Sequence, residues 1–153
     1  MSRWDLFVET FFRADIIQEY WPAIAGGVVV TLEVAALVVV TGILLGLLLA
    51  MVRSYRIAPV NVLIVVFVDV MRALPPLVLI LLTYFGLPSV GLTFSSFAVL
   101  WLVLSLVLAA FAEEIFWAGI LSIRKGQWEA ARSTGLTPLQ AMKIGRASCR
   151  ERV

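Results

Sequence analysis

The chain contains three long blocks of apolar residues, at positions 23–52, 60–87 and 97–123, which shorter polar segments separate. An α-helix rises about 1.5 Å per residue, so about 20 apolar residues cross a hydrocarbon core of about 30 Å. Each block is therefore long enough for one crossing. The pattern predicts an all-α fold, a polytopic transmembrane helical bundle with three spans.

The second block carries two charged residues and a pair of prolines. Asp69 and Arg72 lie one helical turn apart, share a face of the helix, and can form an ion pair. Pro75 and Pro76 follow, and because proline has no N–H it frees a backbone carbonyl and kinks a helix. Lipid cannot satisfy such carbonyls, so we expect this face to point into the bundle.

Several ionisable residues lie within or near the three blocks, and each costs a few kcal/mol or more at membrane depth unless it is paired or hydrated. They are Glu33, Asp69, Arg72, Glu113 and Glu114. One interpretation is a polar translocation path for a solute, with Asp69, Arg72 and Glu114 as its candidate residues. The other is structural: Asp69 and Arg72 neutralise each other, while Glu113 and Glu114 anchor the third span at the headgroup level.

Two glycines in the first block form a G-x-x-x-G pattern, at Gly42 and Gly46. Such a pair lets the backbone of another helix approach closely. Glycine pairs also occur in membrane helices that have no specific partner there. We expect Gly42 and Gly46 to serve helix packing.

The composition excludes several classes of protein. With 62% hydrophobic and 14% charged residues the chain is no ordinary soluble domain. It has no His and one Cys, which excludes a His-based catalytic triad, a two-Cys metal site and a disulfide framework. No nucleophile and base occur at usable spacing, so we expect no enzyme activity, no metal and no catalytic residues. A net charge of +2 spread along the chain does not predict nucleic-acid binding.

The distribution of Lys and Arg predicts the orientation of the spans. Arg53 and Arg56 follow the first block, whereas the connector at 86–96 has no basic residue. Further basic residues follow the third block: Arg124, Lys125, Arg132 and Lys143. By the positive-inside rule the basic segments are cytoplasmic. Residues 1–22 are then an extracytoplasmic segment, or an interfacial helix on the membrane surface, because their apolar residues recur at helical spacing.

The last ten residues break the preceding pattern abruptly. Residues 144–153, which include Cys149, resemble the translation of a common sequencing adapter rather than native protein. The alternative is a genuine basic tail. On the adapter interpretation the transmembrane domain covers residues 23–143 and is truncated.

The segment at 124–143 contains two short predicted helices that meet at a corner. Residues 129–134 suit a helix that Gly135 ends in the left-handed conformation, and Thr137 is a good N-cap for the next helix. Small Ala130 and Ala131 leave a shallow face that a partner protein could cover. A surface loop without function explains the same residues equally well.

Several ordered motifs resemble one family. Glu129-Ala130-Ala131-x-x-x-Gly135 resembles the EAA loop of ATP-binding-cassette importer permeases, and Gly126-Gln127 before it is similar to the form in the polar amino acid subfamily. Three further segments resemble that subfamily, namely Gly26-x-x-x-x-Thr31-Leu32, Phe67-Val-Asp69-Val-Met-Arg72-Ala-Leu-Pro75 and Ala110-Phe-Ala-Glu113-Glu114-Ile115. The chain departs from the family pattern at Ala73 and Leu74, where the subfamily usually has Gly-Thr, and at Trp117, where it usually has Arg.

The resemblance implies a permease subunit of the bacterial inner membrane that moves a polar amino acid delivered by an extracytoplasmic solute-binding protein. Its partners would be a second permease subunit, membrane lipid and an ATPase subunit that binds the ATP, so the chain would hold no cofactor. The residues implied in ATPase coupling are Gly126, Gln127, Glu129, Ala130, Ala131 and Gly135. A fragment of a secondary transporter or a small membrane scaffold or signalling subunit remain as alternatives.

Overall fold

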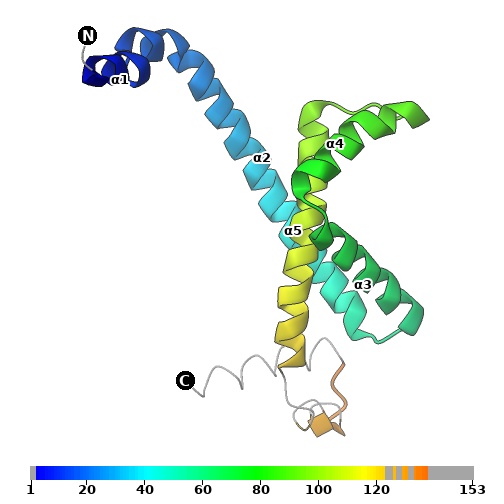
Figure 1. The fold of residues 1–153 in the computed structure, drawn as a ribbon. Coiled ribbons are helices and arrows are strands. Elements are labelled where there is room, and N and C mark those ends of the chain that lie inside the picture. Colours follow the sequence, from blue (N-terminus) through cyan, green and yellow to red (C-terminus); the bar gives the residue numbers. More distant parts are fainter. Residues whose placement is uncertain (1–2, 123–125, 127–128, 131–132, 138–153) are drawn as a thin grey trace. The chain divides into compact units, whose positions relative to one another are not determined.

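The computed structural model describes residues 3–122, 126, 129–130 and 133–137. Every regular element within 3–122 is helical, which confirms the predicted all-α class (Figure 1). The elements are α1 (Arg3–Phe11), α2 (Ala14–Ser54), α3 (Ala58–Ala73), α4 (Pro76–Gly86), the short 3-10 helix η1 (Leu87–Val90) and α5 (Ser96–Leu121). The chain divides into two compact units, Met1–Leu37 and Val38–Val153, which are described in turn.

The first unit contains α1 and the N-terminal part of α2. Aromatic rings follow one another along α1 and just beyond it: the ring of Phe7 lies 4.9 Å from that of Phe11 and 6.1 Å from that of Phe12, which follows the end of the helix. Between the helices, Arg13 Nη2 lies 2.6 Å from Asp15 Oδ2. The hydrogen bond that Arg13 donates lowers the pKa of Asp15. The carboxylate therefore stays charged in the first turn of α2, where negative charge is favourable.

Among the residues that the structure describes, two helices are each long and apolar enough to cross a membrane: Gln18–Ser54 within α2, and α5. The predicted second span, 60–87, is not one continuous helix. It consists of α3 and the Pro76–Val90 segment, which meet at 101°. The kink expected at the prolines is thus a sharp break, and the described residues contain a third span only if the bent pair counts as one.

The break follows from the chemistry of the two prolines. Leu74 has an extended backbone, with φ −95° and ψ 135°, which is the conformation that a following proline favours. Pro76 begins α4, where its missing N–H leaves no helical hydrogen bond unmade. Helix α3 therefore ends at Ala73, and a new helix starts in another direction.

Helix α5 is the central element of the second unit (Figure 1), and α3 and α4 both pack against it. The side chain of Ser95 accepts a hydrogen bond from the backbone N–H of Ala98 at 3.2 Å and caps the start of α5. Two buried apolar clusters form these contacts. Between α4 and α5 the cluster consists of Leu79, Val99, Val103 and Val107. Between α3 and α5 it consists of Ile64, Val68 and Ala110. Burial of these side chains fixes the faces that α3 and α4 turn to α5.

A face of small residues brings α2 against α5. A methyl group added at Gly46 would lie 2.6 Å from Cβ of Ala112 and 2.7 Å from the carbonyl oxygen of Ala109. One added at Gly42 would lie 2.9 Å from atoms of the Leu108 side chain. The predicted packing glycines therefore have a partner helix within this chain, and the contact is closer than any side chain would allow.

We expect Gly46→Ala to lower the thermal unfolding temperature of the purified chain in detergent. The added methyl group must displace the backbone of α5, and overpacking of this kind costs about 1–3 kcal/mol. The matched control is Gly26→Ala, since nothing beyond its own turn of helix lies within 4 Å of a methyl group there. An unfolding temperature that falls equally in both variants would contradict the close approach of α2 and α5.

Candidate functional site

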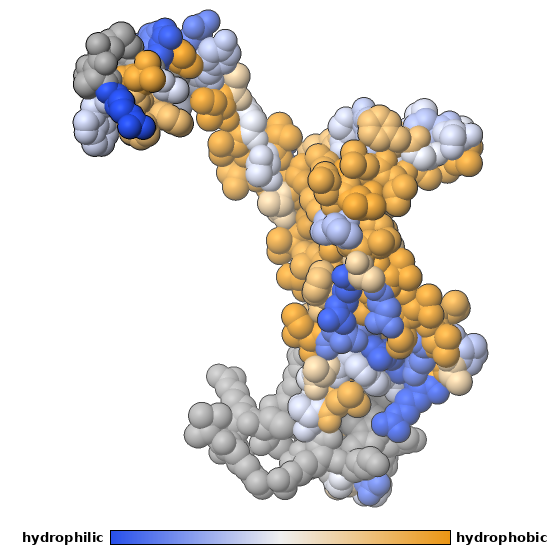
Figure 2. Space-filling model, in the orientation of Figure 1, coloured by the Kyte–Doolittle hydropathy of each residue, from blue (hydrophilic) through white to orange (hydrophobic). Residues whose placement is uncertain are grey.

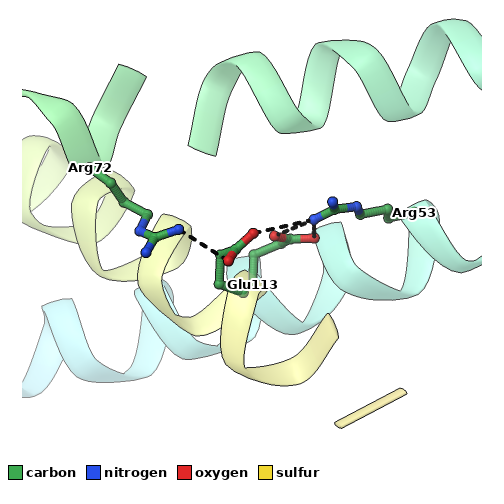
Figure 3. Close-up of polar contacts among 4 residues, drawn as sticks. Arg53, Arg72 and Glu113 are labelled. Atoms are coloured by element: carbon green, nitrogen blue, oxygen red, sulfur yellow. Dashed lines mark hydrogen bonds and ion pairs between the residues drawn. The ribbon is translucent and has the colours of Figure 1, made fainter. Parts of the chain in front are cut away.

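Four charged side chains from three helices meet in the second unit. Arg53 lies in the last turn of α2 and Arg72 in the last turn of α3, while Glu113 and Glu114 are neighbours on α5. Figure 3 shows the α5 carboxylates between the guanidinium groups of Arg53 and Arg72. We call these four residues the charge cluster. On the molecular surface, hydrophilic residues interrupt the otherwise apolar helices (Figure 2).

Glu113 is completely buried, and Arg53 satisfies it. Nη1 of Arg53 donates to both carboxylate oxygens, at 3.0 and 3.1 Å. The guanidinium also lies over the ring of Trp117, with Cζ 4.6 Å from the ring centroid. A buried carboxylate is costly unless it is paired and hydrogen-bonded, so Arg53 and Glu113 depend on each other.

Glu114 connects this buried pair to α3. Its Oε2 lies 3.1 Å from Nη1 of Arg72, and its Oε1 lies 3.6 Å from Nη1 of Arg53. The Arg72 guanidinium also lies over Phe111, with Cζ 5.5 Å from the ring centroid. Two cations and two anions therefore neutralise one another across α2, α3 and α5.

Two structural expectations for these residues are wrong. Asp69 does not pair with Arg72: Asp69 is exposed, and the long Arg72 side chain reaches Glu114 on α5 instead. The alternative in which Glu113 does nothing beyond anchoring the third span is contradicted, because its carboxylate is fully buried and paired with Arg53. In both cases the partner lies on another helix, which a comparison of neighbours along one helix cannot identify.

Arg53 is the functional candidate that the sequence reasoning missed, since it was assigned only to a basic loop. The spacing of residues in the sequence could have identified it. Arg53 continues a stripe on one face of α2 that also contains Gly42, Gly46 and Ala50. Residues on the stripe that packs against another helix are candidates for pairing across it. Trp117, one turn after Glu113, could have been recognised in the same way.

The structure describes only part of the predicted coupling segment. Gly126, Glu129 and Ala130 are helical and exposed, and the Ser133 hydroxyl donates to the carbonyl oxygen of Ala130 at 2.8 Å. Gly135 has φ +82°, the left-handed conformation that the sequence predicted for it. Two other predicted residues, Gln127 and Ala131, lie outside the described residues.

An apolar hollow of about 410 Å³ lies on α4, beyond the break. Its lining residues are Val78, Leu81, Leu82, Phe85 and Gly86. A polar solute finds no hydrogen-bonding side chain among them, so the charge cluster is the better candidate for polar contacts. In the part of the chain that the structure describes, no three carboxylate, His or Cys side chains are grouped to hold a metal ion.

Comparison with known proteins gives a consistent family. The family described as "Binding-protein-dependent transport system inner membrane component" matches residues 42–144. A solved structure described as "Crystal structure of an amino acid ABC transporter with histidines" matches with a TM-score of 0.73 and 34% sequence identity, covering 84% of this chain and 60% of that chain. The chain belongs to this family of inner-membrane transport components, as its motifs predicted.

Curated relatives agree. The L-cystine transport system permease protein TcyB of Bacillus subtilis (strain 168) is 33% identical over 80% of this chain and 53% of its own length. The probable glutamine ABC transporter permease protein GlnP of that organism is 35% identical over 82% and 57%. The glutamate/aspartate import permease protein GltK of Escherichia coli O157:H7 is 35% identical over 80% and 58%. The chain thus spans little more than half the length of these relatives.

We expect Arg53→Met to destabilise the chain strongly, because it leaves the Glu113 carboxylate buried without its partner. Breaking a buried pair costs about 3–5 kcal/mol, whereas replacing both partners by neutral groups costs far less. The double variant Arg53→Met/Glu113→Gln should therefore be more stable than Arg53→Met alone. The measurement is the free energy of unfolding in mixed micelles for Arg53→Met, Glu113→Gln and the double variant. If the losses of the two single variants simply add in the double variant, Arg53 and Glu113 are not coupled.

Proposed function

We propose that this chain acts as a permease subunit of an ATP-binding-cassette importer that moves a polar amino acid across the inner membrane. The partners are a second permease subunit, an ATPase subunit and an extracytoplasmic solute-binding protein. The chain itself hydrolyses nothing, because ATP binds to the ATPase subunit. The basic segments around Arg53 and after α5 face the cytoplasm, and residues 1–22 lie on the opposite side or at its membrane surface.

One observation carries this proposal above the others: the match in fold and sequence to an amino acid ABC transporter over 84% of the chain. The named relatives support the solute class, since their names specify cystine, glutamine and glutamate or aspartate. These names differ from one another, so the proposal extends to polar amino acids as a class. The charge cluster fits that class because it places both signs of charge beside the apolar helices.

Coupling to the ATPase rests on the exposed segment that follows α5. Gly126, Glu129 and Ala130 are exposed, and Gly135, two residues after the helical Ser133, is in the left-handed conformation that turns the chain. An alanine contributes a shallow surface that a partner can approach closely, and Glu129 can contribute a polar contact at its edge. We propose that the residues 126–135, including Gln127 and Ala131, dock on the ATPase subunit.

We expect Ala130→Glu to uncouple transport from ATP hydrolysis in an importer assembled with this subunit. The larger, charged side chain prevents close approach of the ATPase, so uptake should fall at least tenfold, a loss of about 1.4 kcal/mol of coupling free energy. The ATPase subunit should retain its basal turnover. The measurement is solute uptake and ATP hydrolysis in the same proteoliposomes.

The matched control is Ala58→Glu, which introduces the same side chain at an exposed position at the start of α3. A negative charge is favourable at the start of a helix, so this variant should keep normal uptake. Equal loss of uptake in both variants would contradict a specific docking role. Normal uptake with Ala130→Glu would also contradict the docking role. So would a purification of the wild-type chain from its assembled importer in which no ATPase subunit is recovered with it.

A further inference from the structure

The charge cluster consists of an inner pair and an outer pair that differ in exposure. The Arg53 and Glu113 side chains are 15% and 0% exposed, whereas those of Arg72 and Glu114 are 37% and 41% exposed. The inner pair is enclosed and serves the buried carboxylate. The outer pair can be reached from outside the helices, so it can meet a solute.

The outer pair also has hydrogen-bonding capacity left. Its 3.1 Å contact uses Nη1 of Arg72, one of three guanidinium nitrogens, and a guanidinium carries five N–H donors. The Glu114 carboxylate is held in place from its other side by Arg53, at 3.6 Å. A positioned carboxylate beside a guanidinium with free donors offers complementary partners to a molecule that bears both charges.

We propose that Arg72 and Glu114 bind the charged head of an α-amino acid, an inference that rests on the proposed import of amino acids. The solute carboxylate lies against Arg72, because guanidinium groups bind carboxylates through two parallel hydrogen bonds. The solute ammonium lies against Glu114. Because the outer pair and the amino acid head are each neutral overall, binding leaves no uncompensated charge in the apolar surroundings.

The neighbours of Arg72 complete the site. Phe111 is 46% exposed, and the stacking of its ring on the guanidinium orients Arg72. Pro75 and Pro76 stand four residues after Met71 and Arg72 and have no N–H, so the carbonyls of those two residues receive no α-helical hydrogen bond. Freed carbonyls at a broken membrane helix are suited to bind a cation such as an ammonium group.

The test is thermal unfolding of the purified full chain in detergent, with each standard L-amino acid added at millimolar concentration. We expect at least one polar amino acid to raise the unfolding temperature saturably. Its N-acetyl and carboxamide derivatives should give no shift, since each lacks one of the two head charges. No shift with any amino acid, or an equal shift with the derivatives, overturns the proposal.

Variants locate the binding. Arg72→Met and Glu114→Gln should each abolish the ligand-induced shift, measured against the variant's own unfolding temperature. Arg56→Met and Glu19→Gln remove the same charges at exposed positions elsewhere and should keep the shift. A shift that persists in both cluster variants overturns the proposal, because the ligand then binds at another place.

A charge swap separates binding from a purely structural ion pair. Arg72→Glu combined with Glu114→Arg restores this pair but places a second guanidinium beside Arg53, so it should recover only part of the unfolding temperature that the single variants lose. It also removes the guanidinium from the end of α3 and should not recover the ligand shift. A recovered ligand shift overturns the proposal. Binding to the chain needs no ATPase, so a failure here is distinct from a failure of the coupling test at Ala130.

Discussion

The buried carboxylate of Glu113 is the constraint on which the second unit depends. It lies where α5 meets α2, and within the described residues Arg53 is the cation that reaches it, at 3.0 and 3.1 Å. The small faces of Gly42 and Gly46 bring the two helices close enough for that contact. Packing and charge therefore act together: close approach buries the carboxylate, and burial makes a partner on the opposite helix necessary.

The contact between Arg53 and Glu113 also lies close in sequence to the two regions proposed to act in transport, the Arg72–Glu114 pair and the coupling segment after α5. Glu114 follows Glu113 directly, so the same turn of α5 that is held by Arg53 presents a carboxylate to Arg72. Helix α5 ends at Leu121, two turns beyond Glu113, and the exposed coupling segment follows in sequence. A movement imposed on that segment would thus reach α5 close to the charge cluster. The break after α3 begins two residues beyond Arg72 and leaves the carbonyls of Met71 and Arg72 without an α-helical hydrogen bond.

The apolar pattern was sufficient to predict the all-α class, and proline chemistry was sufficient to place the break in the second span. The G-x-x-x-G pattern predicted the close packing at Gly42 and Gly46, and helix-capping rules predicted the left-handed Gly135. These patterns and rules could not predict the partners of charged residues, because pairing across helices depends on which faces meet. Arg72 shares a face with Asp69, yet its side chain spans the gap to Glu114 on α5. The angle of 101° between the halves of the second span likewise depends on how α3 and α4 each pack on α5.

The contact between α2 and α5 positions the charge cluster, and an engineered disulfide tests that contact most directly. Oγ1 of Thr41 and Oγ of Ser105 lie 2.7 Å apart, so cysteines at these positions would bring their sulfur atoms close enough to form a disulfide between α2 and α5. The chain with Thr41→Cys and Ser105→Cys, and with Cys149→Ser, would be oxidised and cleaved by trypsin in the turn at Arg56. We predict that the α2 and α5 fragments of the oxidised chain stay joined until a reductant is added. In a chain with only one of the two cysteines, which cannot form the disulfide, the fragments should separate without a reductant. Fragments of the two-cysteine chain that separate under oxidising conditions would contradict the contact between α2 and α5.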